Sequence, residues 1–126
     1  MNFDRSKRLF EEGQKNLVGA VNSPVRAYKS VGGTPLFIKK AKGSKIIDVD
    51  NNQYIDLVLS YGPMILGHRP KKIEKSIVKA LKNGYTFGAT SAGEIELAKI
   101  ICDAFPGMDK VRFVNSGTEA VLSALR

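Results

Sequence analysis

The stretch NSGTEA, residues 115 to 120, places two small hydroxyl side chains around a glycine just before an expected helix. The first backbone N–H groups of a helix have no partner inside the helix, and the helix dipole makes this end attractive to anions. Ser116 and Thr118 add hydroxyl donors, and Gly117 lets a phosphate group come close to the backbone. These residues predict a phosphate-binding turn.

The same residues also fit a purely structural role. Ser116 and Glu119 have the spacing of a capping box, in which the serine side chain and the glutamate side chain satisfy backbone N–H groups at the helix start. A cap of this kind needs no ligand, and the motif is neither a Walker loop nor a dinucleotide fingerprint. Local chemistry leaves both interpretations open, and they are compatible in part.

The elements that must position this turn form an α/β pattern. A second capping box, Ser91-x-x-Glu94, opens a helix expected to run to residue 105, with apolar residues at helical spacing. Val111, Phe113 and Val114 predict a short strand within residues 109 to 115. The order helix, strand, turn, helix is the beginning of an α/β layer.

The earlier part of the chain is expected to hold smaller elements. Its patterns predict a helix at residues 4–16, a loop with turns at 21–35 and a three-stranded antiparallel meander at 36–57. An irregular buried linker at 59–70 and an amphipathic helix at 71–84 are expected to follow.

Two domains follow from this order of elements. Residues 1–70 form an N-terminal segment with the small meander, and residues 71–126 begin a larger α/β domain.

Metal sites are not expected. The single cysteine, Cys102, and the single histidine, His68, cannot form a zinc site by themselves. Asp48 begins a spacing that resembles a calcium loop, but Gln53 and Leu59 stand where that loop requires glycine and glutamate. We expect Cys102 to be a buried structural thiol, because no neighbouring cation activates it.

Composition indicates a globular protein, with 43% hydrophobic and 25% charged residues among 126. The N-terminus lacks an apolar signal core, and no apolar run reaches the about 18 residues of a membrane span. A cytoplasmic location is therefore expected. The net charge of +8 leaves open a basic module that binds nucleic acid or membrane through Lys72, Lys75 and Lys79, although solvated lysines are the more common explanation.

The segment FVNSGTEAVLSALR resembles the phosphate-binding turn of class III aminotransferases, which use pyridoxal phosphate and have the α/β architecture called fold type I. Other segments are similar, in order and spacing, to a branch of aminomutases in tetrapyrrole synthesis. They are VNSPVRAY at 21–28, YGPMILGH at 61–68, YTFGATSAGEIELAKII at 85–101 and VRFVNSGTEA at 111–120. The resemblance runs from about Leu9 to Arg126.

This resemblance implies roles for particular residues. Ser116, Gly117 and Thr118 match positions that hold the phosphate of the cofactor, and Ser23 and Arg26 match positions that bind the substrate carboxylate. An arginine suits this task because its guanidinium group reads a carboxylate with two parallel hydrogen bonds.

The chain also departs from the family at several positions. Tyr61, which the resemblance places in the substrate site, stands where the family usually has tryptophan. Arg69 and Pro70 replace a common Ala-His continuation after His68, which is expected to be structural.

The resemblance further implies that this chain is the N-terminal portion of a longer enzyme. The family's Schiff-base lysine and the aspartate that pairs with the pyridine nitrogen lie downstream, and neither position exists here, so we expect the 126 residues alone to be inactive.

The complete enzyme is expected to be a homodimer using pyridoxal or pyridoxamine phosphate. It would convert glutamate-1-semialdehyde, a small-molecule substrate, into 5-aminolevulinate, with no nucleic-acid or membrane partner. Another class III ω-aminotransferase is the alternative, and the short acidic substrate suggested by NSPVR argues against it.

Overall fold

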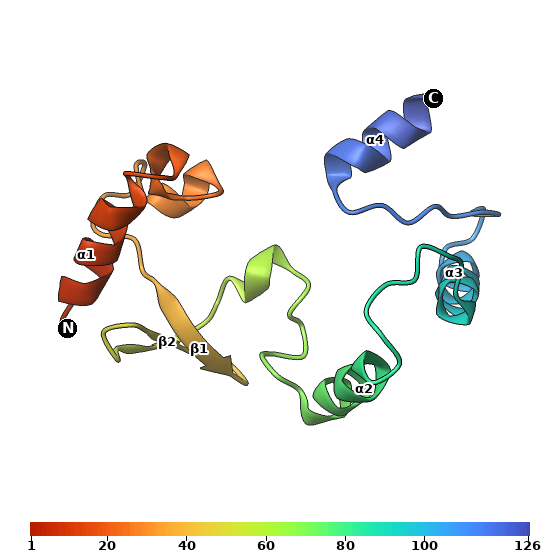
Figure 1. The fold of residues 1–126 in the computed structure, drawn as a ribbon, viewed down its shortest axis with the longest axis horizontal. Helices are drawn as coiled ribbons and strands as arrows, with labels where there is room; N and C mark the ends of the chain where they lie inside the picture. The colour runs from red at the N-terminus through yellow and green to blue at the C-terminus, as the bar shows by residue number, and fades with distance from the viewer. The chain divides into compact units, whose positions relative to one another are not determined.

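The computed structural model describes residues 1 to 126 and divides into two compact units, Met1–Asn83 and Gly84–Arg126 (Figure 1). The division lies between the amphipathic helix and the following segment. The domain boundary expected after residue 70 concerns the longer protein and stays a prediction.

The first unit is organised around the predicted meander. Three antiparallel strands pair in the order β1-β2-β3 and span Ile38–Lys42, Lys45–Asp48 and Gln53–Ile55. Lys42 pairs with Lys45 across a tight turn at Gly43, whose φ of 58° favours glycine. Asn51, with φ 72°, lies in the next turn, where a short polar side chain tolerates this conformation. The expected meander is confirmed.

Helix α1, Asp4–Gly13, is tied to this sheet by Asp50. The carboxylate of Asp50 accepts hydrogen bonds from the backbone amides of Arg5 and Ser6 at 2.8 and 2.9 Å, and from the Ser6 hydroxyl at 2.6 Å. No side chain at the helix's own N-cap position serves this purpose. Asp50 therefore caps α1 from a turn about 45 residues away in sequence.

The segment after α1 is more regular than the expected loop. The 3₁₀ helix η2, Pro24–Ala27, lies in the loop expected at residues 21–35, and a second one, η1 at Val18–Ala20, precedes it and contacts both α1 and η2. Proline at the start of η2 has a φ that suits a helical first turn, which explains why this loop coils. Ala20 and Ala27 are buried there.

Asp48, the last residue of β2, is a fully buried polar group. Its carboxylate accepts hydrogen bonds from the Asn52 backbone and side-chain amides, both at 2.8 Å, and from the Tyr54 hydroxyl at 2.9 Å. Burial by itself raises the pKa of Asp48, but these hydrogen bonds outweigh it and leave the pKa below its usual value. The pKa of Tyr54 is raised to about 12, mainly by burial of the hydroxyl and secondly by its hydrogen bond to Asp48.

We expect the Tyr54 hydroxyl to titrate near pH 12, two units above the ordinary value of 10.0. The folded state then holds this proton more tightly than the unfolded state, so its contribution to stability is present below pH 10 and is lost as the pH rises toward 12. The difference in tyrosinate absorbance between the wild type and Tyr54→Phe measures the midpoint. Asp48→Asn should move that midpoint toward 10, and a wild-type midpoint already near 10 would contradict the prediction.

Helix α2, Lys71–Leu81, is the predicted amphipathic helix, and its apolar stripe of Ile73, Ile77 and Val78 remains about half exposed. The irregular segment before it differs from expectation. Residues 59–70 were expected to be buried, but Ile65 and Leu66 are 81% and 66% exposed. Within these 126 residues nothing packs over them.

The second unit contains two helices, α3 at Ala92–Ala104 and α4 at Gly117–Leu125. The predicted capping box is present, since the Glu94 carboxylate accepts hydrogen bonds from the Ser91 amide at 3.0 Å and hydroxyl at 3.1 Å. Cys102 is half-buried rather than buried, and no side chain of this unit is fully buried. No helix in either unit has the length and apolar character needed to cross a membrane.

The strand expected within residues 109–115 is absent, and that prediction was wrong at the level of secondary structure. The segment has no ladder hydrogen bonds. Its strand-like pattern cannot be satisfied because a strand requires a neighbour, and the described residues offer it none.

Candidate functional site

The start of α4 combines both roles that the sequence allows. The Ser116 hydroxyl accepts a hydrogen bond from the Glu119 amide at 3.2 Å, and the Glu119 carboxylate accepts one from the Asn115 amide at 2.7 Å. Ser116 is therefore a side-chain cap, and Glu119 folds back to the backbone, but its carboxylate meets the Asn115 amide and not the Ser116 amide that a complete capping box requires.

The cap leaves the anion-binding donors unused. The amides of Gly117 and Thr118 donate no hydrogen bond within the chain, and a Cβ atom added to Gly117 would meet nothing within 4 Å. The free N–H groups lie at the positive end of a helix and the space beside Gly117 is open, an arrangement that fits a phosphate group. Capping and phosphate binding are thus compatible at this turn.

Arg26 and Tyr61 line one cavity of about 480 Å³ in the first unit. Asp56 and His68 line the same cavity. Ser23 does not line it, but the Ser23 carbonyl accepts a hydrogen bond from the Arg26 amide at 2.9 Å and so closes the η2 turn. The structure thus brings two of the three expected substrate residues together, while Ser116, Gly117 and Thr118 lie in the second unit.

The guanidinium group of Arg26 has no partner. It makes no ion pair with any carboxylate of the chain, and its side chain is exposed. A free guanidinium fork at the wall of a cavity is suited to bind a carboxylate from solution. The one carboxylate that lines the cavity, that of Asp56, is paired with His68 instead.

Tyr61 is carried by an unusual backbone turn. The 3₁₀ helix η3, Leu59–Tyr61, has three consecutive residues with positive φ, of 51°, 53° and 64°, and none of them is glycine. This left-handed conformation costs about 1–2 kcal/mol per residue, because Cβ crowds the following carbonyl oxygen. Such strain persists only where the surrounding structure holds it in place.

Asp56 holds the start of this turn. One carboxylate oxygen accepts hydrogen bonds from the backbone amides of Val58 and Leu59 at 2.9 and 3.1 Å. The other oxygen lies 2.7 Å from His68 Nε2. The hydrogen bond from His68 keeps the pKa of Asp56 below its usual value, and the two backbone hydrogen bonds add to this effect.

The sequence predicts a structural role for His68 but does not indicate its partner. A signal for half of the arrangement existed, because an aspartate two residues before a turn commonly accepts hydrogen bonds from the backbone ahead of it. No local signal could connect Asp56 with His68, which is 12 residues further along.

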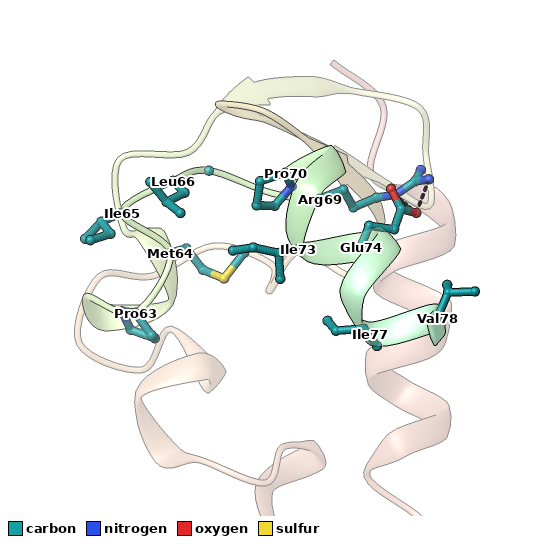
Figure 2. A pocket seen from close by; sticks show the side chains of 11 residues that line it. Pro63, Met64, Ile65, Leu66, Arg69, Pro70, Ile73, Glu74, Ile77 and Val78 are labelled. Atoms are coloured by element: carbon teal, nitrogen blue, oxygen red, sulfur yellow. Dashed lines mark hydrogen bonds and ion pairs between the residues drawn. The ribbon is translucent and has the colours of Figure 1, made fainter. Parts of the chain in front are cut away.

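A second, apolar cavity of about 660 Å³ lies between the segment 63–67 and helix α2. Figure 2 shows Met64 and Ile73 facing this cavity, with the Arg69–Glu74 ion pair at its edge. It is larger than the cavity of Arg26, but it contains no group that binds an anion apart from Arg69, which is paired at 2.8 Å. The unpaired guanidinium group of Arg26, and not the size of the cavity, therefore identifies the candidate substrate site.

Comparison with known proteins gives one family and many relatives. The family Aminotransferase class-III matches residues 27–126. Glutamate-1-semialdehyde 2,1-aminomutases of Thermodesulfovibrio yellowstonii and Persephonella marina are 56% and 58% identical over 100% of this chain. The chain spans only 30% and 29% of their lengths.

Solved structures of aminotransferases superpose on this chain. A β-phenylalanine aminotransferase from Variovorax paradoxus superposes with a TM-score of 0.89 and 33% identity, covering 97% of this chain and 28% of that one. A transaminase with pyridoxal phosphate (PLP) bound gives a TM-score of 0.87 and 29% identity, covering 99% of this chain and 29% of that one.

Proposed function

Since this chain belongs to the class-III aminotransferase family, we propose that it is the N-terminal part of a longer enzyme that converts glutamate-1-semialdehyde into 5-aminolevulinate. The observation that carries the proposal is the unpaired Arg26 in a cavity with Tyr61. A free arginine at this place suits a small substrate with one carboxylate. Residues 1–70 then form an N-terminal segment, and residues 71–126 begin the large domain.

Each site residue has a distinct task in this proposal. The amides of Gly117 and Thr118, with the hydroxyl groups of Ser116 and Thr118, bind the phosphate of the cofactor. When bound, pyridoxal phosphate or its amine form accepts and returns the amino group. Arg26 binds and orients the substrate carboxylate, Ser23 closes the turn that carries Arg26, and Tyr61 packs against the substrate.

The activity is tested with the polypeptide that continues beyond Arg126. Supplied with pyridoxamine phosphate, it should form 5-aminolevulinate from glutamate-1-semialdehyde without an added amino donor. Transfer of an amino group only from an external donor such as a β-amino acid would favour another ω-aminotransferase of the family. The 126-residue chain alone should show no turnover, because the residues that hold the rest of the cofactor are missing from it.

The complete enzyme is proposed to act in the cytoplasm as a homodimer. The half-exposed apolar stripe of α2 and the exposed segment before it support burial by further polypeptide. The alternative of a basic module rests on Lys72, Lys75 and Lys79 on the same helix, and it predicts binding to nucleic acid or membrane that weakens steeply with salt.

We expect Gly117→Val to weaken cofactor binding by at least about tenfold, the equivalent of losing roughly one hydrogen bond to a charged group. The new side chain would fill the open space beside Gly117, next to the free amides, without disturbing the fold, because the added Cβ meets nothing outside its own turn of helix within 4 Å. The bound fraction is measured from cofactor absorbance after dialysis.

Gly93→Val is the matched control, since Gly93 occupies the first turn of α3 in similarly open space. It should leave cofactor binding unchanged. Equal retention of cofactor by both variants would remove Gly117 from the phosphate site.

A further inference from the structure

We propose that Asp56 and His68 are positioning residues that hold the left-handed η3 turn, and with it Tyr61, at the wall of the substrate cavity. This inference rests on the proposed function, because it gives the turn a task in substrate binding. Neither residue needs to touch the substrate for this role.

The strain of the turn is the first observation. Leu59, Ser60 and Tyr61 all have positive φ, and only the next residue, Gly62, adopts such values without cost. Left to itself, this segment would relax to ordinary φ values and carry Tyr61 to another place. Something must therefore bias it toward the observed conformation.

Asp56 supplies that bias at the entrance of the turn. Its carboxylate accepts hydrogen bonds from the Val58 and Leu59 amides, and Leu59 is the first residue with a left-handed conformation. A carboxylate accepts but does not donate hydrogen bonds, so the bond of 2.7 Å to His68 places a proton on Nε2 of the imidazole.

His68 connects Asp56 to the rigid part of the unit. The His68 amide donates to the Gly43 carbonyl at 2.8 Å, and the Gly43 amide donates to the His68 carbonyl at 2.9 Å. Gly43 is the tight turn between β1 and β2, so the sheet fixes the backbone of His68. The side chains of the pair are 16% and 8% exposed, which limits competition from water.

The Asp56–His68 pair lines the cavity of Arg26, which supports a role in substrate binding. Asp56, Ser60, Tyr61 and His68 line the same cavity as Arg26. A displacement of the turn therefore changes the shape of the cavity that also contains the guanidinium group of Arg26. The geometry points to an effect on substrate affinity rather than on the chemical step.

The test uses the complete enzyme and compares His68→Leu with His68→Gln. Leucine removes the donor to Asp56, and glutamine keeps an N–H group at a similar place. We expect His68→Leu to raise KM for glutamate-1-semialdehyde by about tenfold, consistent with the release of one or two strained residues, and to change kcat less than threefold. His68→Gln should recover most of the wild-type KM.

A second substitution separates positioning from simple destabilisation. Glycine adopts the φ of Ser60 without strain, so Ser60→Gly added to His68→Leu should lower KM again. If His68→Leu does not fold, Asp56→Ser takes its place, because serine can still accept a hydrogen bond from the turn but cannot reach His68.

Two outcomes would overturn the inference. One is a KM that stays at the wild-type value in His68→Leu or Asp56→Ser, with only a lower melting temperature. The other is a raised KM that Ser60→Gly fails to lower. A wild-type enzyme without aminomutase turnover would instead refute the proposed function, so the two failures are distinguishable.

Discussion

Arg26→Ala is expected to lower kcat/KM of the complete enzyme for glutamate-1-semialdehyde by at least about 100-fold. A hydrogen bond between charged groups contributes about 1.5–3 kcal/mol, and a guanidinium fork makes two of them with a carboxylate. The loss of about 3 kcal/mol corresponds to a factor of about 100 in rate or affinity. No lysine or second arginine lines this cavity to replace Arg26, and the imidazole of His68 is already bonded to Asp56.

Two further variants make this result specific. Arg26→Lys should recover only part of the loss, because an ammonium group cannot form the paired hydrogen bonds. Lys29→Ala removes an exposed cation of the same loop that does not line the cavity, and it should change kcat/KM less than twofold. Cofactor absorbance should be normal in all three. A similar loss in Lys29→Ala would show that general positive charge, and not Arg26, attracts the substrate.

Gly67→Ala is expected to destabilise the first unit by about 2–4 kcal/mol, through a steric clash added to an unfavourable φ. The new Cβ would lie 2.8 Å from the Gly43 carbonyl oxygen and 3.1 Å from its carbon, and both are backbone atoms that cannot rotate away. The φ of 73° adds further strain for alanine. The segment must therefore move and break the two hydrogen bonds between Gly43 and His68.

Gly43→Ala provides the control for this prediction. Gly43 also has a positive φ, of 58°, but an added Cβ meets nothing within 4 Å. Gly43→Ala should therefore lower the free energy of unfolding only by the cost of placing alanine in this backbone conformation, about 1 kcal/mol. Thermal denaturation and hydrogen exchange of the His68 amide measure both variants. Equal destabilisation by the two alanines would contradict the close approach of the backbones.

Elements with a strong local signal could be predicted from sequence. The α3 helix was found from Ser91 and Glu94, whose reciprocal contacts are encoded within four residues. The α2 helix followed from its apolar stripe, and the meander from β-prone runs separated by turn residues. In each case the information lies in one short window of the chain.

Features that depend on distant residues could not be predicted in this way. Asp50 caps a helix that begins 46 positions earlier, and no motif announces such a contact. The segment 109–115 carried a valid strand pattern and yet formed none, because a strand depends on its neighbours. For the site, Gly117 was predicted from local chemistry, whereas Arg26 required the resemblance to a family because a lone arginine in a loop has no signal of its own.

The unpaired segment 109–115 creates a risk of aggregation while the protein is being synthesised. Apart from the Asn115 amide, which donates to Glu119, its backbone makes no ladder hydrogen bonds, and Phe113 and Val114 are 43% and 37% exposed, so the segment can pair with a strand of another chain. Lys110 and Arg112 alternate with the apolar residues and place repelling charge on each copy. In the proposed longer enzyme, these two charges should reduce aggregation of the segment during synthesis until a neighbouring strand pairs with it.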